Sequence, residues 1–194
     1  MKLPFDFTVS RMRAMALMVA ACASFLPFAP VAHAQTGTGP AQSTQSQKLS
    51  TVDQQFLQDA GQAGATEIAA SKLALTRAGD PQVREFAERM IVDHTKLARN
   101  LDVIAKRHGI TAPPATDSSL IGSLKNLQGA DFDRAYIEEV AVAVHQKAVE
   151  LFRKESENGN DTALKAAANK ALPVISHHYH YAMARQFAKP KATS

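Results

Sequence analysis

Apolar residues recur at steps of three and four positions from about residue 50 to residue 187, and good helix formers occupy many of the positions between them. No stretch alternates apolar and polar residues for long enough to indicate a β-strand. Prolines, glycines and N-cap residues divide this region into four long segments. These segments are 50–79, 80–108, 131–158 and 160–187. The pattern therefore predicts an all-helical domain.

The connections between the predicted helices indicate how the helices are arranged. Two connections are very short, and one of them places Asp80 as an N-cap before Pro81 at the first helical position. The connection over 111–129 is long, contains adjacent prolines and leaves room for a short extra helix around 119–127. Four helices of similar length joined in this way favour an up-down-up-down four-helix bundle.

Each predicted helix has one inward-facing stripe, and an ionisable residue lies on or beside each stripe. The ionisable residues are Glu67, His94, His145 and His178, with His145 just beside its stripe. With a rise of about 1.5 Å per residue, alternating helix directions place all four near mid-height, about 16 to 24 Å from one end. The apolar stripe positions are Phe56, Ala60, Ala63, Ala70, Ala74, Val83, Ala87, Met90, Leu97, Leu101, Ile104, Ile137, Val140, Val144, Ala148, Leu151, Leu164, Ala168, Ala171, Ile175 and Ala182.

These four side chains are candidate metal ligands. An isolated ionised glutamate inside a bundle is costly and needs a partner. A divalent cation that takes one nitrogen or oxygen from each helix would meet that need, and a shell rich in histidine and free of thiols suits zinc, copper or iron. The alternative is that Glu67 hydrogen-bonds to one histidine while water or backbone carbonyls satisfy the others. Sequence alone leaves both interpretations open.

Three neighbouring features bear on this site. Asp93 could accept a hydrogen bond behind the ligands or be a solvated charge. His177 and His180 share a helix face by their spacing of three, and this face is expected to be exposed and to bind metals only adventitiously. Pro173 lies inside the last predicted helix and should kink it just before these histidines.

The N-terminus has the layout of a secretory signal peptide. Arg11 and Arg13 precede an apolar run, which closes with small residues ahead of a predicted cleavage site after Ala34. Cys22 follows small residues and offers lipidation as the alternative, while two prolines and a short length argue against a retained membrane anchor. We therefore expect a periplasmic or secreted protein with no transmembrane segment in its mature chain.

Cleavage would leave a flexible polar leader over 35–49, the helical domain over 50–189 and a tail over 190–194. It would also remove the single cysteine, which excludes disulfides, thiolate metal sites and a cysteine nucleophile. The net charge of +4 arises without any run of five like charges, so no nucleic-acid partner is expected. No Gly-x-Ser-x-Gly, phosphate-loop or His-Glu-x-x-His motif occurs, so a hydrolase would depend on a metal-bound water.

Four strings along the chain resemble the exported bacterial family known as domain of unknown function 4142. These strings are FLQDA at 56–60, RMIVDHTK at 89–96, FDRAYI at 132–137, and LP at 172–173 ahead of His178. The resemblance covers roughly Val52 to Ala184 and implies a ferritin-like fold and export. Members are often labelled outer membrane proteins and have no established activity. The matching positions imply that the inward polar residues of such a family are Glu67, His94, His145 and His178.

The chain departs from better-known ferritin-like proteins because it contains no Glu-x-x-His pair, so a carboxylate-bridged di-iron centre is not expected. Two functions remain. One is a metal-binding bundle that holds a single transition-metal ion for buffering, sensing or redox work. The other is a non-catalytic structural or interaction module of the cell envelope, whose exposed helix faces bind an unknown partner. An enzymatic activity is the less favoured reading.

Overall fold

The computed structural model describes residues 48–186, and this part of the chain is helical with no strand. The all-helical prediction is confirmed. The predicted signal peptide, Cys22 and the tail over 190–194 lie outside the described residues. The elements in chain order are α1 (Thr51–Arg77), α2 (Pro81–Arg107), α3 (Ser118–Lys125), α4 (Gly129–Ala135), the π-helix η1 (Tyr136–Val144), α5 (His145–Asn158) and α6 (Thr162–Gln186).

Capping residues explain where the helices begin. Ser50 accepts a hydrogen bond from the backbone N–H of Asp53 and caps α1. Asp80 accepts from the N–H of Gln82 and caps α2, with proline at the first helical position as the sequence indicates. The short helix α3 lies within the long connection where an extra helix was expected. The third long helix starts two residues earlier than predicted and is divided into α4, η1 and α5.

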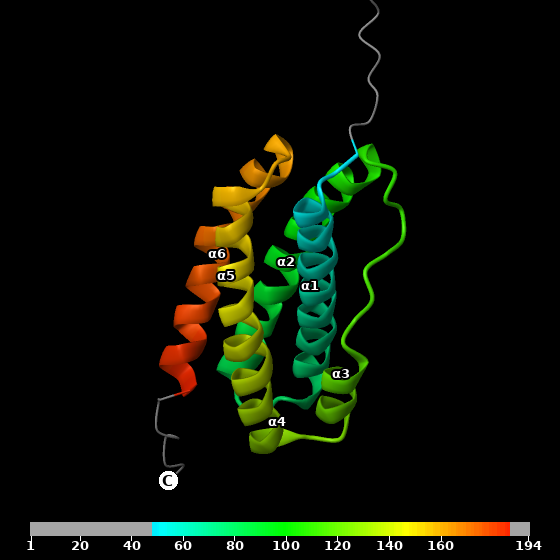
Figure 1. Ribbon diagram of the computed structural model, residues 1–194. Coiled ribbons are helices and arrows are strands. Elements are labelled where there is room, and N and C mark those ends of the chain that lie inside the picture. The colour runs from blue at the N-terminus through cyan, green and yellow to red at the C-terminus, as the bar shows by residue number, and fades with distance from the viewer. Residues whose placement is uncertain (1–47, 187–194) are drawn as a thin grey trace, which may run out of the picture. The chain divides into compact units, whose positions relative to one another are not determined.

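The long helices pack side by side in a ring of contacts (Figure 1). Helix α1 packs along α2 on one side and along η1 and α5 on the other, while α6 packs along α5, η1 and α2. Successive long helices run in opposite directions, and the connection after α2 runs beside α1 before it reaches α3. No helix in residues 48–186 combines the length and apolarity needed to cross a membrane.

The buried apolar residues form two clusters. One includes Phe86, Phe132 and Tyr136, and the other includes Phe56 and Phe152. Along each long helix, residues of one cluster precede the predicted ionisable residue and residues of the other cluster follow it. A polar layer therefore separates the two clusters.

Most predicted stripe positions are buried, and those of α6 are all buried. The stripe predicted for the third helix is wrong at Val144 and Leu151, which are only partly buried. Their places in the core are taken by His145 and Phe152. The π-helix accounts for this shift, because its wider turn lets Val140 and Ala141 both lie in the core and makes His145, five positions after Val140, the next buried residue after them. Ala63 and Leu97 are likewise only partly buried.

Candidate metal centre

The polar layer consists of one ionisable side chain from each long helix, and all four side chains are nearly inaccessible to solvent. The ring centroids of the three histidines lie 5.3–5.8 Å from one another. The structure thus brings together the four residues that the sequence analysis selected. They are Glu67 of α1, His94 of α2, His145 at the start of α5 and His178 of α6, with exposed fractions of 1%, 4%, 0% and 3%.

Glu67 lies between two of the histidines. Its Oε2 atom is 2.9 Å from Nδ1 of His94, and its Oε1 atom is 3.1 Å from Nδ1 of His145. One ligand atom from each of these three residues lies within 4.8 Å of the other two. The spacing is short enough for a single cation to contact all three side chains.

Hydrogen bonding leaves much of this group unsatisfied. Despite the short contacts, Oε1 of Glu67, both ring nitrogens of His94 and Nε2 of His145 lack a partner with hydrogen-bond geometry. Nδ1 of His145, besides its contact with Glu67, forms a long hydrogen bond of 3.4 Å with the carbonyl oxygen of Val140. Buried polar atoms without partners are rare, and a bound ion is one of the few things that explain them.

His178 has a carboxylate partner outside the group of three. Its Nε2 atom lies 3.0 Å from Oδ2 of Asp93, whose side chain is 39% exposed. When the neutral imidazole donates Nε2–H to this carboxylate, Nδ1 becomes the acceptor nitrogen. Metal-binding histidines commonly have such a carboxylate on the far nitrogen, which fixes the tautomer and the ring orientation. Of the two roles considered for Asp93, the geometry corresponds to the acceptor.

The electrostatics of the layer follow from burial and from the Glu67 charge. Burial raises the pKa of the Glu67 carboxyl, but positive charge on His94 and His145 outweighs it and lowers the pKa below the usual value. Burial lowers the pKa of His94, whereas Glu67 raises it by more, so the net pKa is raised. Burial lowers the pKa of His145, and burial with the charges of its neighbours lowers the pKa of His178 to about 4. At neutral pH Glu67 is ionised, and His145 and His178 are neutral imidazoles able to bind a metal.

Ser71 and Tyr136 form a second buried polar pair one helical turn from Glu67, and the sequence analysis did not identify it. The hydroxyl oxygens of the two residues are 2.8 Å apart. Burial raises the pKa of the Tyr136 hydroxyl, so the phenol stays neutral. A tyrosine at the start of a helical stripe has no sequence signal that separates it from an ordinary core residue.

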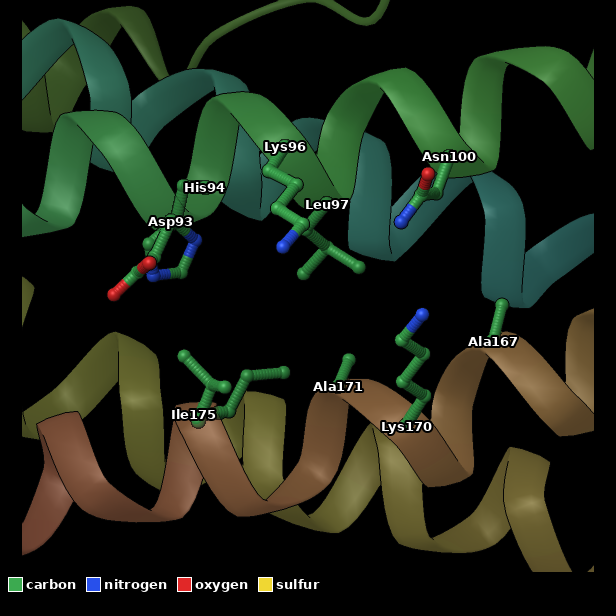
Figure 2. A pocket seen from close by; sticks show the side chains of 10 residues that line it. Asp93, His94, Lys96, Leu97, Asn100, Ala167, Lys170, Ala171 and Ile175 are labelled. Atoms are coloured by element: carbon green, nitrogen blue, oxygen red, sulfur yellow. The ribbon is translucent and has the colours of Figure 1, made fainter.

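Two hollows reach His94 from the surface. The smaller, of about 130 Å³, lies between α2 and α6. In Figure 2, Asp93 and His94 extend from α2 into this gap and Ile175 faces them from α6. The larger hollow, of about 890 Å³, lies between α1, α2 and the connection that follows α2. His177 and His180 are exposed, and neither lines either hollow.

Comparisons with known proteins identify a matching family and a similar fold, but no activity. A family model described as Domain of unknown function (DUF4142) matches residues 38–185. Among curated proteins, none matches the chain. Among solved structures, the crystal structure of a DUF305 fragment from Deinococcus radiodurans is similar, with a TM-score of 0.62 and 15% sequence identity. The match covers 72% of this chain and 97% of the fragment, and at this identity it speaks for a shared fold alone.

Proposed function

The chain belongs to the family described as Domain of unknown function (DUF4142), and we propose that it binds one transition-metal ion in its helical core. The observation that carries the proposal is the buried group of Glu67, His94 and His145, whose ligand atoms lie within 4.8 Å of one another while several lack hydrogen-bond partners. The group combines one negative carboxylate with imidazole nitrogens. Such a set matches the preferences of zinc, copper and iron.

His178 is the proposed fourth ligand, through Nδ1. Its ring lies as close to the other two histidines as they lie to each other, within a few tenths of an ångström. The contact between its Nε2 atom and Asp93 supports this assignment, because it leaves Nδ1 free to bind. The centre would then have one ligand from each long helix. Such a centre could serve metal storage, metal sensing or one-electron transfer, because each of these roles needs only a stable set of direct ligands.

We also propose a fold and a location for this centre. The four long helices form an up-down-up-down, ferritin-like four-helix bundle, a proposal supported by the ring of contacts among α1, α2, α5 and α6. The protein is exported after cleavage behind Ala34, a proposal supported by the arginines, apolar run and small residues of the N-terminus. Mass spectrometry of the protein from its envelope fraction tests the cleavage, because an acylated N-terminus at Cys22 would contradict it.

The alternative function is a non-catalytic interaction module of the cell envelope. The contacts of Glu67 with two histidines, and of His178 with Asp93, favour it to the extent that they already compensate the buried charge. On this interpretation the polar layer fixes the register of the helices, and an unknown partner binds the exposed faces. The two functions differ in one measurable respect, which is whether a metal stabilises the fold.

Thermal unfolding in the presence of metals tests the proposal. A cation that binds only the folded protein raises Tm, with about 2.7 kcal/mol of stabilisation when its free concentration is 100 times Kd. We expect one of zinc, copper or iron to raise Tm and a chelator to reverse the rise. Elemental analysis of protein purified without a histidine tag should find about one metal ion per chain by the same proposal.

Matched variants separate the buried centre from the exposed histidines. His94→Ala and His145→Gln should abolish the metal-induced rise in Tm, with circular dichroism used to verify that each variant remains helical. The double variant His177→Ala/His180→Ala should retain the rise. The opposite result, in which the double variant loses the rise and His94→Ala keeps it, would reject the buried centre and support the interaction module.

A further inference from the structure

The larger hollow lies under the connection from α2 to α3, which we call the strap (residues 109–117). One end of the strap is fixed by a hydrogen bond from the N–H of Ile110 to the carbonyl of Ala105, at 3.0 Å. The other end is fixed by a hydrogen bond from the N–H of Asp117 to Oγ1 of Thr66, at 2.9 Å. One anchor thus attaches the strap to Ala105 of α2 and the other attaches it to the buried Thr66 of α1.

Between these anchors the strap forms one wall of a hollow of about 890 Å³ that is open to the surface. Pro114 contacts α1 directly, since a Cβ at Gly61 would lie 2.8 Å from its Cγ atom. The next glycine of α1, Gly64, has no such neighbour. Gly64 is buried, yet a Cβ at this position would meet no atom within 4 Å. Gly64 thus borders space in the hollow that the protein's own side chains leave unfilled.

The lining of the cavity defines the chemistry of a ligand. Small and apolar side chains of α1, α2 and the strap supply most of it, including Ala60, Ala65, Leu101, Ala105 and Pro113. A volume between about 300 and 1,000 Å³ with a mostly apolar lining and a few polar groups is typical of small-molecule sites. The mostly apolar lining of this open hollow therefore fits a molecule with a substantial apolar part.

Two polar groups on α2 mark where the polar end of such a molecule would lie. Arg99 lines the cavity and has no ion-pair partner among residues 48–186. Lys106 also lines it, but its ammonium group is paired with Asp102 at 2.7 Å. The unpaired guanidinium is therefore the available partner for a negatively charged head group. His94, 4% exposed and with both ring nitrogens unpartnered, borders the same space.

We propose that the open hollow lined by α1, α2 and the strap binds an amphipathic acid, with the apolar chain over Gly64 and the carboxylate at Arg99. This function goes beyond metal binding and does not depend on it, because the proposed contacts are apolar packing and one ion pair. The site also places the ligand beside His94, so a bound acid would close the route from the surface to the metal centre through this cavity.

Displacement of the fluorescent probe 1-anilinonaphthalene-8-sulfonate by decanoate tests the proposal. The decisive variant is Gly64→Leu, whose Cβ would meet no atom within 4 Å and whose larger side chain would extend into the hollow. It should weaken decanoate binding at least tenfold. Gly64→Ala, which leaves most of the space open, should retain binding, and both variants should keep or raise Tm because glycine disfavours a helix interior. Gly122→Leu, at an exposed position of α3, serves as the control for an added leucine.

The charge and the occupant are tested separately. Arg99→Gln should weaken binding of decanoate several-fold and leave binding of 1-decanol unchanged, because only the acid has a charge. Equal decanoate affinity for the wild type and Gly64→Leu would overturn the proposal. Binding that appears only after removal of residues 35–47 would also overturn it, because the leader would then be the natural occupant. Repeating the titration with a chelator separates the two sites, since metal binding can fail while decanoate binding persists.

Discussion

Glu155 of α5 is a buried carboxyl group outside the polar layer. Its side chain is 1% exposed, and neither of its oxygens has a hydrogen-bond partner among the described residues. Gly159 makes this burial possible, since a Cβ there would lie 2.3 Å from Oε1 of Glu155. Asp53 lies nearby and is itself buried, but its oxygens accept hydrogen bonds from Ser50 and from the N–H of Asn160. The unsatisfied member of the pair is therefore Glu155.

The Glu155 environment predicts a measurable pH dependence of stability. Burial, followed by the negative charge of Asp53, raises the pKa of Glu155 from 4.5 to about 7. Because the pKa is higher in the folded state, folding favours the protonated carboxyl. The stabilisation that depends on this proton is fully present below pH 4.5 and is lost as pH rises through 7. Asp161 adds to this effect and Lys165 opposes it. Glu155→Gln, which stays neutral, should match the wild type near pH 4.5 and exceed its Tm by a few degrees at pH 8.

The control for this comparison is Glu157→Gln on the same helix, where the side chain is exposed. Its Tm difference from the wild type should not depend on pH over the same range. A Glu155→Gln variant whose Tm stays parallel to that of the wild type from pH 4.5 to 8 would show that Glu155 is not held protonated by its surroundings.

Individual residues differ in how far the sequence reveals them. Glu67 and the histidines of α2 and α6 are identified because they interrupt regular apolar stripes, which requires only helix periodicity. The Glu155 pair is not identified, because its environment depends on a backbone N–H at Asn160, 107 residues from Asp53. Contacts of that separation follow from the packing of helix ends, and the sequence does not define helix ends closely enough to derive them.

At the level of elements, the π-helix η1 decides which residue of the third long helix enters the core. The helix enters η1 with Tyr136 and Ile137 inward and leaves it with His145 inward and 0% exposed. A regular α-helix has 3.6 residues per turn and would favour position 144 instead. The wider π turn absorbs the additional residue, so it delivers His145 to Glu67 at 3.1 Å. Sequence periodicity assumes one helix type, which is why it placed His145 only beside the stripe.

This account predicts the effect of deleting one residue from η1. Removing Ala143, which is exposed, should let the segment return to regular α-helical spacing and rotate His145 by about 100° relative to the preceding turn. We expect a protein that is still helical by circular dichroism but whose Tm no longer responds to metal. Ala143→Gly keeps the residue count and should retain the response apart from a small loss of stability. An unchanged metal response in the deletion variant would mean that η1 does not position the ligand.

At the level of the whole described chain, the polar layer lies between two apolar clusters that share no residue. Each long helix passes through both clusters and contributes its ionisable side chain between them. Without a metal, the layer is held by few hydrogen bonds, since four of its polar atoms have none. With a metal, each ligand bond would join helices that belong to both clusters. The all-helical fold could be predicted from the sequence because it needs only local patterns, whereas this division of the core depends on packing.

Hydrogen exchange tests whether the metal couples the two clusters. Opening of either cluster separates helices at the layer and breaks ligand bonds, so a bound ion makes both openings more costly. We expect metal to slow amide exchange in α1, α2, α5 and α6 on both sides of the layer, and a chelator to restore the faster rates. His94→Ala should show no slowing at any of these amides. Slowing confined to α6 around His177 and His180 would assign the metal to the exposed face, and the layer would then serve only to set the register of the helices.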